Sequence, residues 1–200
     1  MAYPAVDSPY GLDPINLIGG QVFAGSTRLM PIASGYATNI FNGDVVKLTS
    51  DGTLVKDTGT TTATPVGVFM GCSYTDPVLK YKIFSQYFPA NTVASDIQAV
   101  VVDDPDTLFK VAVVSGTTVI AGVARSSVVG KNMALVQNAG LTTSGDSKVA
   151  VLSSSAATTN TLPVRVIDVV YETVDSSGNF TEVIVKWNFG MHQYENATGV

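Results

Sequence analysis

Short apolar runs separated by turn residues follow one another along the chain from residue 42 onward. Residues 42–71 read NGDVVKLTSDGTLVKDTGTTTATPVGVFMG, where Asp51-Gly52 separates two runs as a hairpin turn would. The later runs are LKYKIFSQYF, IQAVVVD, LFKVAVVS, TTVIAGVA, SKVAVLS, LPVRVIDVVYETV and FTEVIVKWNF. All are rich in β-branched and aromatic residues, which suit a pleated sheet. Many short strands at close spacing predict an all-β fold, a compact β-barrel or sandwich.

The last run shows strand periodicity most clearly. In TEVIVKW, the apolar Val183, Val185 and Trp187 alternate with the other residues of the run. Because successive side chains of a strand point to opposite faces, this alternation predicts one buried face. Further turns are expected at 103–106 and 176–179.

Two stretches depart from the strand pattern. The segment VARSSVVGKNMALVQNAG is expected to form loop with one or two helical turns, because Gly130 interrupts its apolar spacing. The Ser/Thr-rich stretch SSSAATTNT at 153–161 is typical of an exposed loop.

The first 41 residues differ from the rest of the chain. YPAVDSPYGLDPINLIGG contains Pro4, Pro9 and Pro14, and proline favours extended chain. An extended N-terminal arm is therefore expected, and its apolar side chains must be buried somewhere. The arm either packs along its own domain or lies on a neighbouring subunit or partner.

These patterns divide the chain into two parts. Residues 1–41 are expected to hold the extended arm and lead-in strands, and residues 42–200 the β-barrel or sandwich domain. A boundary near residue 105 would separate a small second β subdomain within that domain.

Composition narrows the class of partner. Charged residues make up only 14% of the 200 residues, hydrophobic residues 46%, and the net charge is −5. Small neutral polar groups replace the missing charges, which favours contact with another protein because few charges must be desolvated. The basic residues are scattered, which argues against nucleic-acid binding.

The chain offers no pattern that predicts association with a membrane. No apolar run approaches the roughly 20 residues of a membrane-spanning helix. The opening MAYPAVDSPYGLDP has no basic and apolar signal-peptide pattern, so synthesis in a cytoplasm is expected.

Candidate chemical groups are few. Asp103-Asp104-Pro105-Asp106 suits a tight turn; a weak divalent-cation site or an acid–base pair are the alternatives. The sole histidine, His192, lies in the polar tail GMHQYENATGV, where a solvated side chain is expected, or else a group that shifts an interface with pH. Cys72 is expected to be a small buried strand residue. We therefore expect no enzyme activity, no cofactor and no metal.

A cluster of aromatic residues lies in YKIFSQYFPA. Tyr81, Phe84, Tyr87 and Phe88 have the π faces that stack on bases, but the acidic chain makes a buried strand pair the simpler interpretation.

The strand motifs carry a resemblance to a known family. GDVVKLTSDGTLVKD and TPVGVFMGCSYTD resemble the head decoration, or cement, proteins of tailed bacteriophages. The opening segment through GDVV is also similar to virion structural proteins of marine phages, including those of cyanobacteria. The resemblance covers most of the chain and is strongest in residues 1–75.

The resemblance implies a structural role. Such a protein binds the outer surface of an icosahedral head, contacts the major capsid protein, commonly forms a homotrimer at three-fold positions, and is made in the cytoplasm of the bacterial host. In the family the N-terminal segment often makes the capsid contact, and no residue is catalytic. The expected contact residues are Tyr3, Tyr10, Leu12, Ile15, Leu17 and Ile18.

Three other functions are the rival hypotheses. Another virion part, such as a head fibre, tail component or host-binding module, would share these strands. A small β-barrel enzyme or ligand carrier would need convergent polar residues in a pocket, and none stands out. A major capsid protein would need a long helix, for which no helical period is long enough.

Overall fold

β-Strands dominate the computed structural model, which describes residues 8–173 and 181–200. The strands are β1 (Asp13–Leu17), β2 (Arg28–Pro31), β3 (Val45–Leu48), β4 (Leu54–Lys56), β5 (Gly67–Thr75), β6 (Lys82–Ser85), β7 (Gln98–Val102), β8 (Thr107–Val114), β9 (Asn132–Met133), β10 (Leu135–Val136), β11 (Ala150–Leu152), β12 (Val164–Val169) and β13 (Glu182–Trp187). The described helices are α1 (Arg125–Val128) and the 3₁₀ turns η1 (Ser153–Ser155) and η2 (Tyr171–Thr173). The all-β prediction is confirmed.

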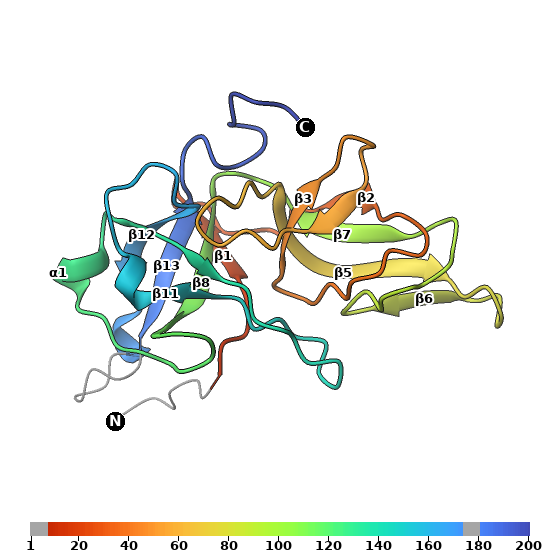
Figure 1. Ribbon diagram of the computed structural model, residues 1–200, viewed down its shortest axis with the longest axis horizontal. Coiled ribbons are helices and arrows are strands. Elements are labelled where there is room, and N and C mark those ends of the chain that lie inside the picture. Colours follow the sequence, from red (N-terminus) through yellow and green to blue (C-terminus); the bar gives the residue numbers. More distant parts are fainter. Residues whose placement is uncertain (1–7, 174–180) are drawn as a thin grey trace.

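The strands form two sheets that lie side by side along the long axis of the molecule (Figure 1). One sheet has the order β10-β11-β8-β13-β12-β9, with β1 on β8, and curves into a nearly closed barrel. We call it the barrel lobe. The other has the order β2-β7-β5-β3-β4, with β6 on β5, and we call it the sheet lobe.

The first 41 residues contribute to both lobes where they are described. Strand β1 pairs antiparallel with β8, placing Asp13 opposite Lys110, while β2 pairs with β7. The described part of the extended segment therefore packs on its own molecule. After β7 the chain returns to the barrel lobe through residues 103–106, near the expected boundary.

The two sheets have separate cores that meet at one end of the sheet lobe. Phe109 and Trp187 pack in the barrel core with ring centroids 5.5 Å apart. Val45, Val68 and Val102 come from strands of the sheet lobe, yet their side chains belong to this same barrel core. The barrel core therefore extends across the joint and includes side chains of both lobes, and the sheet lobe has a second core of its own.

Two glycines allow the backbones to approach closely at that joint. Leu12 N donates to Gly43 O at 3.0 Å, and Gly11 N donates to Val149 O at 3.2 Å. Gly11 and Gly43 have φ values of +93° and +87°, and a Cβ on Gly11 would lie 2.7 Å from Gly43 O. Only glycine adopts this conformation in this space without displacing the backbone.

A buried carboxylate joins the lobes beside these glycines. Asp44 Oδ2 accepts from Phe41 N at 2.9 Å and from Lys56 Nζ at 2.8 Å, both in the sheet lobe. Its Oδ1 accepts at 2.6 Å from the hydroxyl of Ser147, in the connection between β10 and β11. Asp44 is inaccessible to solvent, so these donors replace the water that the carboxylate loses on folding.

Two departures from the strand pattern fall close to where they were expected, whereas the run TTVIAGVA, predicted as a strand, forms only an isolated bridge between Val114 and Ile120. Helix α1 supplies the expected helical turn before Gly130. The 153–161 stretch is less exposed than predicted. It begins with η1, and Ala157 forms a β-bridge with Asn132. The side-chain amide of Asn132 also donates to Thr159 O. The expected turn at 176–179 lies outside the described residues.

The C-terminal tail corrects one expectation. His192 is fully buried instead of solvated, with its ring between those of Trp187 and Tyr194. The polarity of the neighbouring sequence was misleading, because the tail folds back against the joint and hides this one ring.

Replacing Asp44 by Ala should lower the free energy of unfolding by about 3–5 kcal/mol, because the Lys56 ammonium would lose its buried partner. Urea unfolding measures this loss. Asp51→Ala, in the exposed β3–β4 turn, is the control and should change stability by less than about 0.5 kcal/mol. Equal stability of the two variants would show that the carboxylate does not support the joint.

Candidate binding surface

Exposed apolar side chains gather at the connection between β5 and β6. Val78 and Phe84 are each 82% exposed, Leu79 61% and Tyr81 53%. We call residues 76–84 the hairpin tip; it lies at the end of the sheet lobe farthest from the barrel (Figure 1). Such a concentration of exposed apolar surface typically marks a contact with another molecule.

The turn of the hairpin tip is held by its own hydrogen bonds. Asp76 Oδ1 accepts from Val78 N at 2.7 Å and from Leu79 N at 2.8 Å. Asp76 O accepts from Lys80 N, and Tyr81 O accepts from Asp76 N, both at 3.0 Å. The exposed side chains are therefore presented on an ordered backbone, which lowers the entropy cost of docking.

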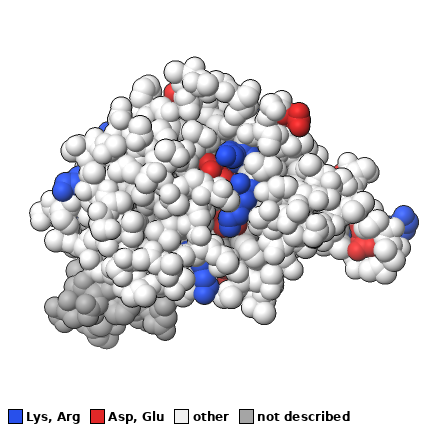
Figure 2. Space-filling model, in the orientation of Figure 1, with Lys and Arg blue, Asp and Glu red and all other residues white. Residues whose placement is uncertain are grey.

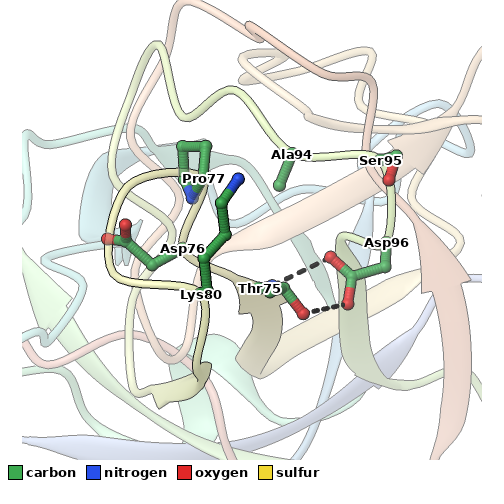
Figure 3. A pocket seen from close by; sticks show the side chains of 7 residues that line it. All are labelled: Thr75, Asp76, Pro77, Lys80, Ala94, Ser95 and Asp96. Atoms are coloured by element: carbon green, nitrogen blue, oxygen red, sulfur yellow. Dashed lines mark hydrogen bonds between the residues drawn. The ribbon is translucent and has the colours of Figure 1, made fainter.

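The carboxylate of Asp96, in the segment just before β7, connects that segment to the base of the hairpin. Asp96 accepts from Thr75 N at 2.8 Å, from Thr75 Oγ1 at 2.7 Å and from Lys82 Nζ at 3.1 Å (Figure 3). The Thr75 backbone and hydroxyl donors, followed by Lys82, lower the pKa of Asp96 from 3.8 to about 2. We call this group of bonds the Asp96 clamp.

A shallow pocket of about 400 Å³ opens beside the clamp. It is lined by Thr75, Asp76, Pro77, Lys80, Ala94, Ser95 and Asp96. Figure 3 shows the Lys80 side chain extended between Pro77 and Ala94, with the carboxylate of Asp96 directed toward Thr75 and that of Asp76 pointing away from it. Next to the apolar tip, this pocket offers a recess for a protruding side chain of a partner.

The wider surface has few charges. Figure 2 shows a face made mostly of uncharged residues, with basic and acidic side chains next to one another near its middle. Within the described residues, no group of three or more His, Cys, Asp or Glu side chains is arranged to hold a metal ion. No helix in the described part is long and apolar enough to cross a membrane.

The structure places the six expected contact residues in different surroundings. Leu12 is buried in the barrel core, so its side chain cannot reach a partner. Ile15 and Leu17 are half-buried on β1, and Ile18, just beyond it, is exposed. Tyr3 lies outside the described residues.

Tyr10 holds the N-terminal segment against the barrel. Its hydroxyl donates to Glu182 Oε1 at 2.6 Å, and Lys110 Nζ lies 5.5 Å from its ring centroid. Burial, followed by the bond to Glu182, raises the pKa of this phenol well above its usual range. Tyr10 therefore acts in the fold of this molecule.

The sequence predicted that the four clustered aromatic side chains would be buried, and two of them are exposed instead. Phe88 is buried and Tyr87 half-buried, with the Tyr87 ring stacked on Phe41 at 5.5 Å. Tyr81 and Phe84 are exposed; Phe84 points to the face of β6 opposite Ile83, and Ile83 packs against the core of the sheet lobe. The Asp76-Pro77 turn signal marks the tip, but the sequence does not show that β6 ends the sheet.

The remaining candidates have structural roles. Asp104 Oδ1 accepts from Asp106 N at 2.8 Å, which confirms the turn prediction for 103–106. Asp103 pairs with Arg28 at 2.9 Å. Cys72 is buried on β5 as expected, and burial raises the pKa of its thiol to about 12.

Comparison with known proteins found no matching family model, no matching curated protein and no matching solved structure.

The Asp96 clamp should open only in strong acid. Because folding lowers the pKa of Asp96, the clamp is fully formed above about pH 4 and is lost as the pH falls through about 2. The chemical shift of the Thr75 amide measures this by NMR. In Asp96→Asn the shift should lose its acid transition, and a wild-type midpoint near 4 would contradict the clamp.

Proposed function

We propose that this protein is a structural virion component that binds the outer surface of an icosahedral phage head and stabilises it as a cement protein. The observation that carries the proposal is the hairpin tip, an ordered turn with four exposed apolar side chains. The resemblance of residues 43–57 and 64–76 to decoration proteins and the low charge of the chain support it.

The hairpin tip is suited to a protein surface. Burying apolar area contributes roughly 25 cal/mol per Å², and Val78, Leu79 and Phe84 already project into solvent. Lys82 is neutralised by Asp96 within the same clamp, so docking of the tip need not desolvate an unpaired charge at that position. The proposed partner is the major capsid protein.

Stabilisation of the head follows from linkage. A protein that binds only the assembled shell adds its binding free energy to the cost of taking the shell apart. A homotrimer at a three-fold position would engage three capsid subunits together, with a high effective concentration for the second and third contacts. In this proposal the protein is synthesised in the host cytoplasm and resides on the outer surface of the virion.

The hairpin tip also changes which contact is expected to dominate. Of the expected N-terminal contact residues, Leu12 is in the core and Tyr10 is bonded to Glu182. The sheet lobe therefore carries the main shell contact, and residues 1–7 a second one. The two can be tested separately, because every described strand begins after residue 7.

The double variant Val78→Ser/Phe84→Ser should bind heads that lack the protein at least tenfold more weakly, because buried apolar anchors dominate such interfaces. Co-sedimentation with purified heads measures the affinity. Val119→Ser/Tyr171→Ser, at exposed apolar positions on the barrel lobe, is the matched control and should bind as the wild type does.

Unchanged affinity of the hairpin variant, with loss of binding on removal of residues 1–7, would move the contact to the N-terminal segment. Failure of the wild type to bind heads, together with binding to host cells, would replace the proposal by a host-binding module.

A further inference from the structure

The chain after β13 returns across the joint between the two lobes. Its course is fixed first at Asn188, whose side chain donates to Asn160 O at 2.8 Å and to Leu162 O at 3.0 Å. We call residues 188–195 the C-terminal strap. Figure 1 shows the end of the chain above the joint, between the barrel and the sheet lobe.

The strap is bonded to the sheet lobe at several points. Gln193 N donates to Pro65 O at 2.9 Å, and Gln193 Oε1 accepts from Leu48 N at 3.0 Å. The Tyr194 hydroxyl donates to Asp103 Oδ2 at 2.8 Å, and the Arg28 guanidinium lies 5.7 Å from the Tyr194 ring centroid. The strap thus joins elements that are distant in sequence.

His192 is the buried anchor of the strap. Its ring is fully buried, 6.5 Å from the ring of Trp187 and 5.1 Å from that of Tyr194. Nδ1 accepts from Tyr194 N at 3.2 Å, so the proton of the neutral ring is on Nε2. Nε2 is buried and has no hydrogen-bond partner among the described residues, although the Val66 carbonyl is close enough to the ring to favour its charged form.

The charges around His192 do not compensate for its burial. Burial lowers the pKa of the imidazole. The Val66 carbonyl and the carboxylates of Asp103 and Asp104 act in the opposite direction, because they favour the charged ring, but their effect is smaller. Lys186 on β13 favours the neutral ring. The remaining charged groups nearby are Arg28, engaged by Asp103, and Glu195 on the strap, whose buried Oε2 has no partner in the described residues.

We propose that the C-terminal strap is an acid-sensitive latch: it docks over the joint with His192 neutral and is released when a second proton binds the ring. That proton would sit on Nδ1, where the Tyr194 N–H already points, so two donors would face each other. Release would uncover the indole of Trp187, together with Leu48 N and Asp103, and change the surface at the joint.

The direction of the pH effect follows from the pKa of His192. The docked ring has a pKa below the ordinary 6.5, so docking is fully favourable above about pH 6.5. Below that pH the free strap binds the proton more tightly than the docked strap, and docking weakens by about tenfold per pH unit until the docked ring also titrates.

The experiment uses the sole histidine and sole tryptophan of the chain, which are in contact. An NMR titration of the His192 imidazole gives its pKa without further assignment, and Trp187 emission reports exposure of the indole. Hydrogen exchange of the Gln193 amide, corrected for intrinsic rates, should lose protection by about tenfold per pH unit below pH 6.5. Amides of β8 and β13 should keep their protection over the same pH range.

Two variants separate the latch from general destabilisation. His192→Phe keeps a ring of similar size but cannot titrate, so protection of Gln193 should no longer depend on pH. Tyr194→Phe removes the bond to Asp103, so it should loosen the strap at every pH and leave the pH dependence intact. A wild-type imidazole pKa of 6.5 or above, or loss of protection in β8 together with the strap, would overturn the proposal.

Discussion

The burial of one carboxylate at the joint between the lobes is the constraint on which the rest of the structure depends. Asp44 has no access to water, and its donors come from Phe41, Lys56 and Ser147, in both lobes. A buried charge is tolerated only where such donors converge. The relative position of the barrel and the sheet is therefore fixed by the need to satisfy this group, and the close approach of Gly11 to Gly43 makes that position accessible.

With the joint fixed at one end, the other end of the sheet lobe is free to project. The hairpin tip lies far from the apolar core that the lobes share, and its order comes from local bonds to Asp76 and Asp96. This separation suits a protein that works by adhesion. Changes to the exposed side chains of the tip leave the core untouched, so the contact surface and the stability of the fold depend on different residues.

The C-terminal strap adds a third element to the joint, with a different chemistry. Asp44 is satisfied by the Lys56 ammonium, a backbone amide and a hydroxyl, whereas His192 accepts a backbone hydrogen bond at Nδ1, which suits the neutral ring. The joint thus combines a permanent connection with one that responds to protons. In the proposed cement protein, the same molecule would hold its fold while the surface over the joint changed.

The sequence by itself determined the fold class and the local turns. Alternation of Val183, Val185 and Trp187 gave one buried face, and Asp51-Gly52 gave the β3–β4 hairpin, because strand periodicity and turn chemistry are local. Tertiary structure alone decided which polar groups are buried and which apolar groups are exposed. His192 is hidden and Phe84 is not, because the chain reverses over the first, while the second points to the face of β6 that lies away from the sheet-lobe core. Neighbour relations between distant segments leave no periodic signal in a single sequence.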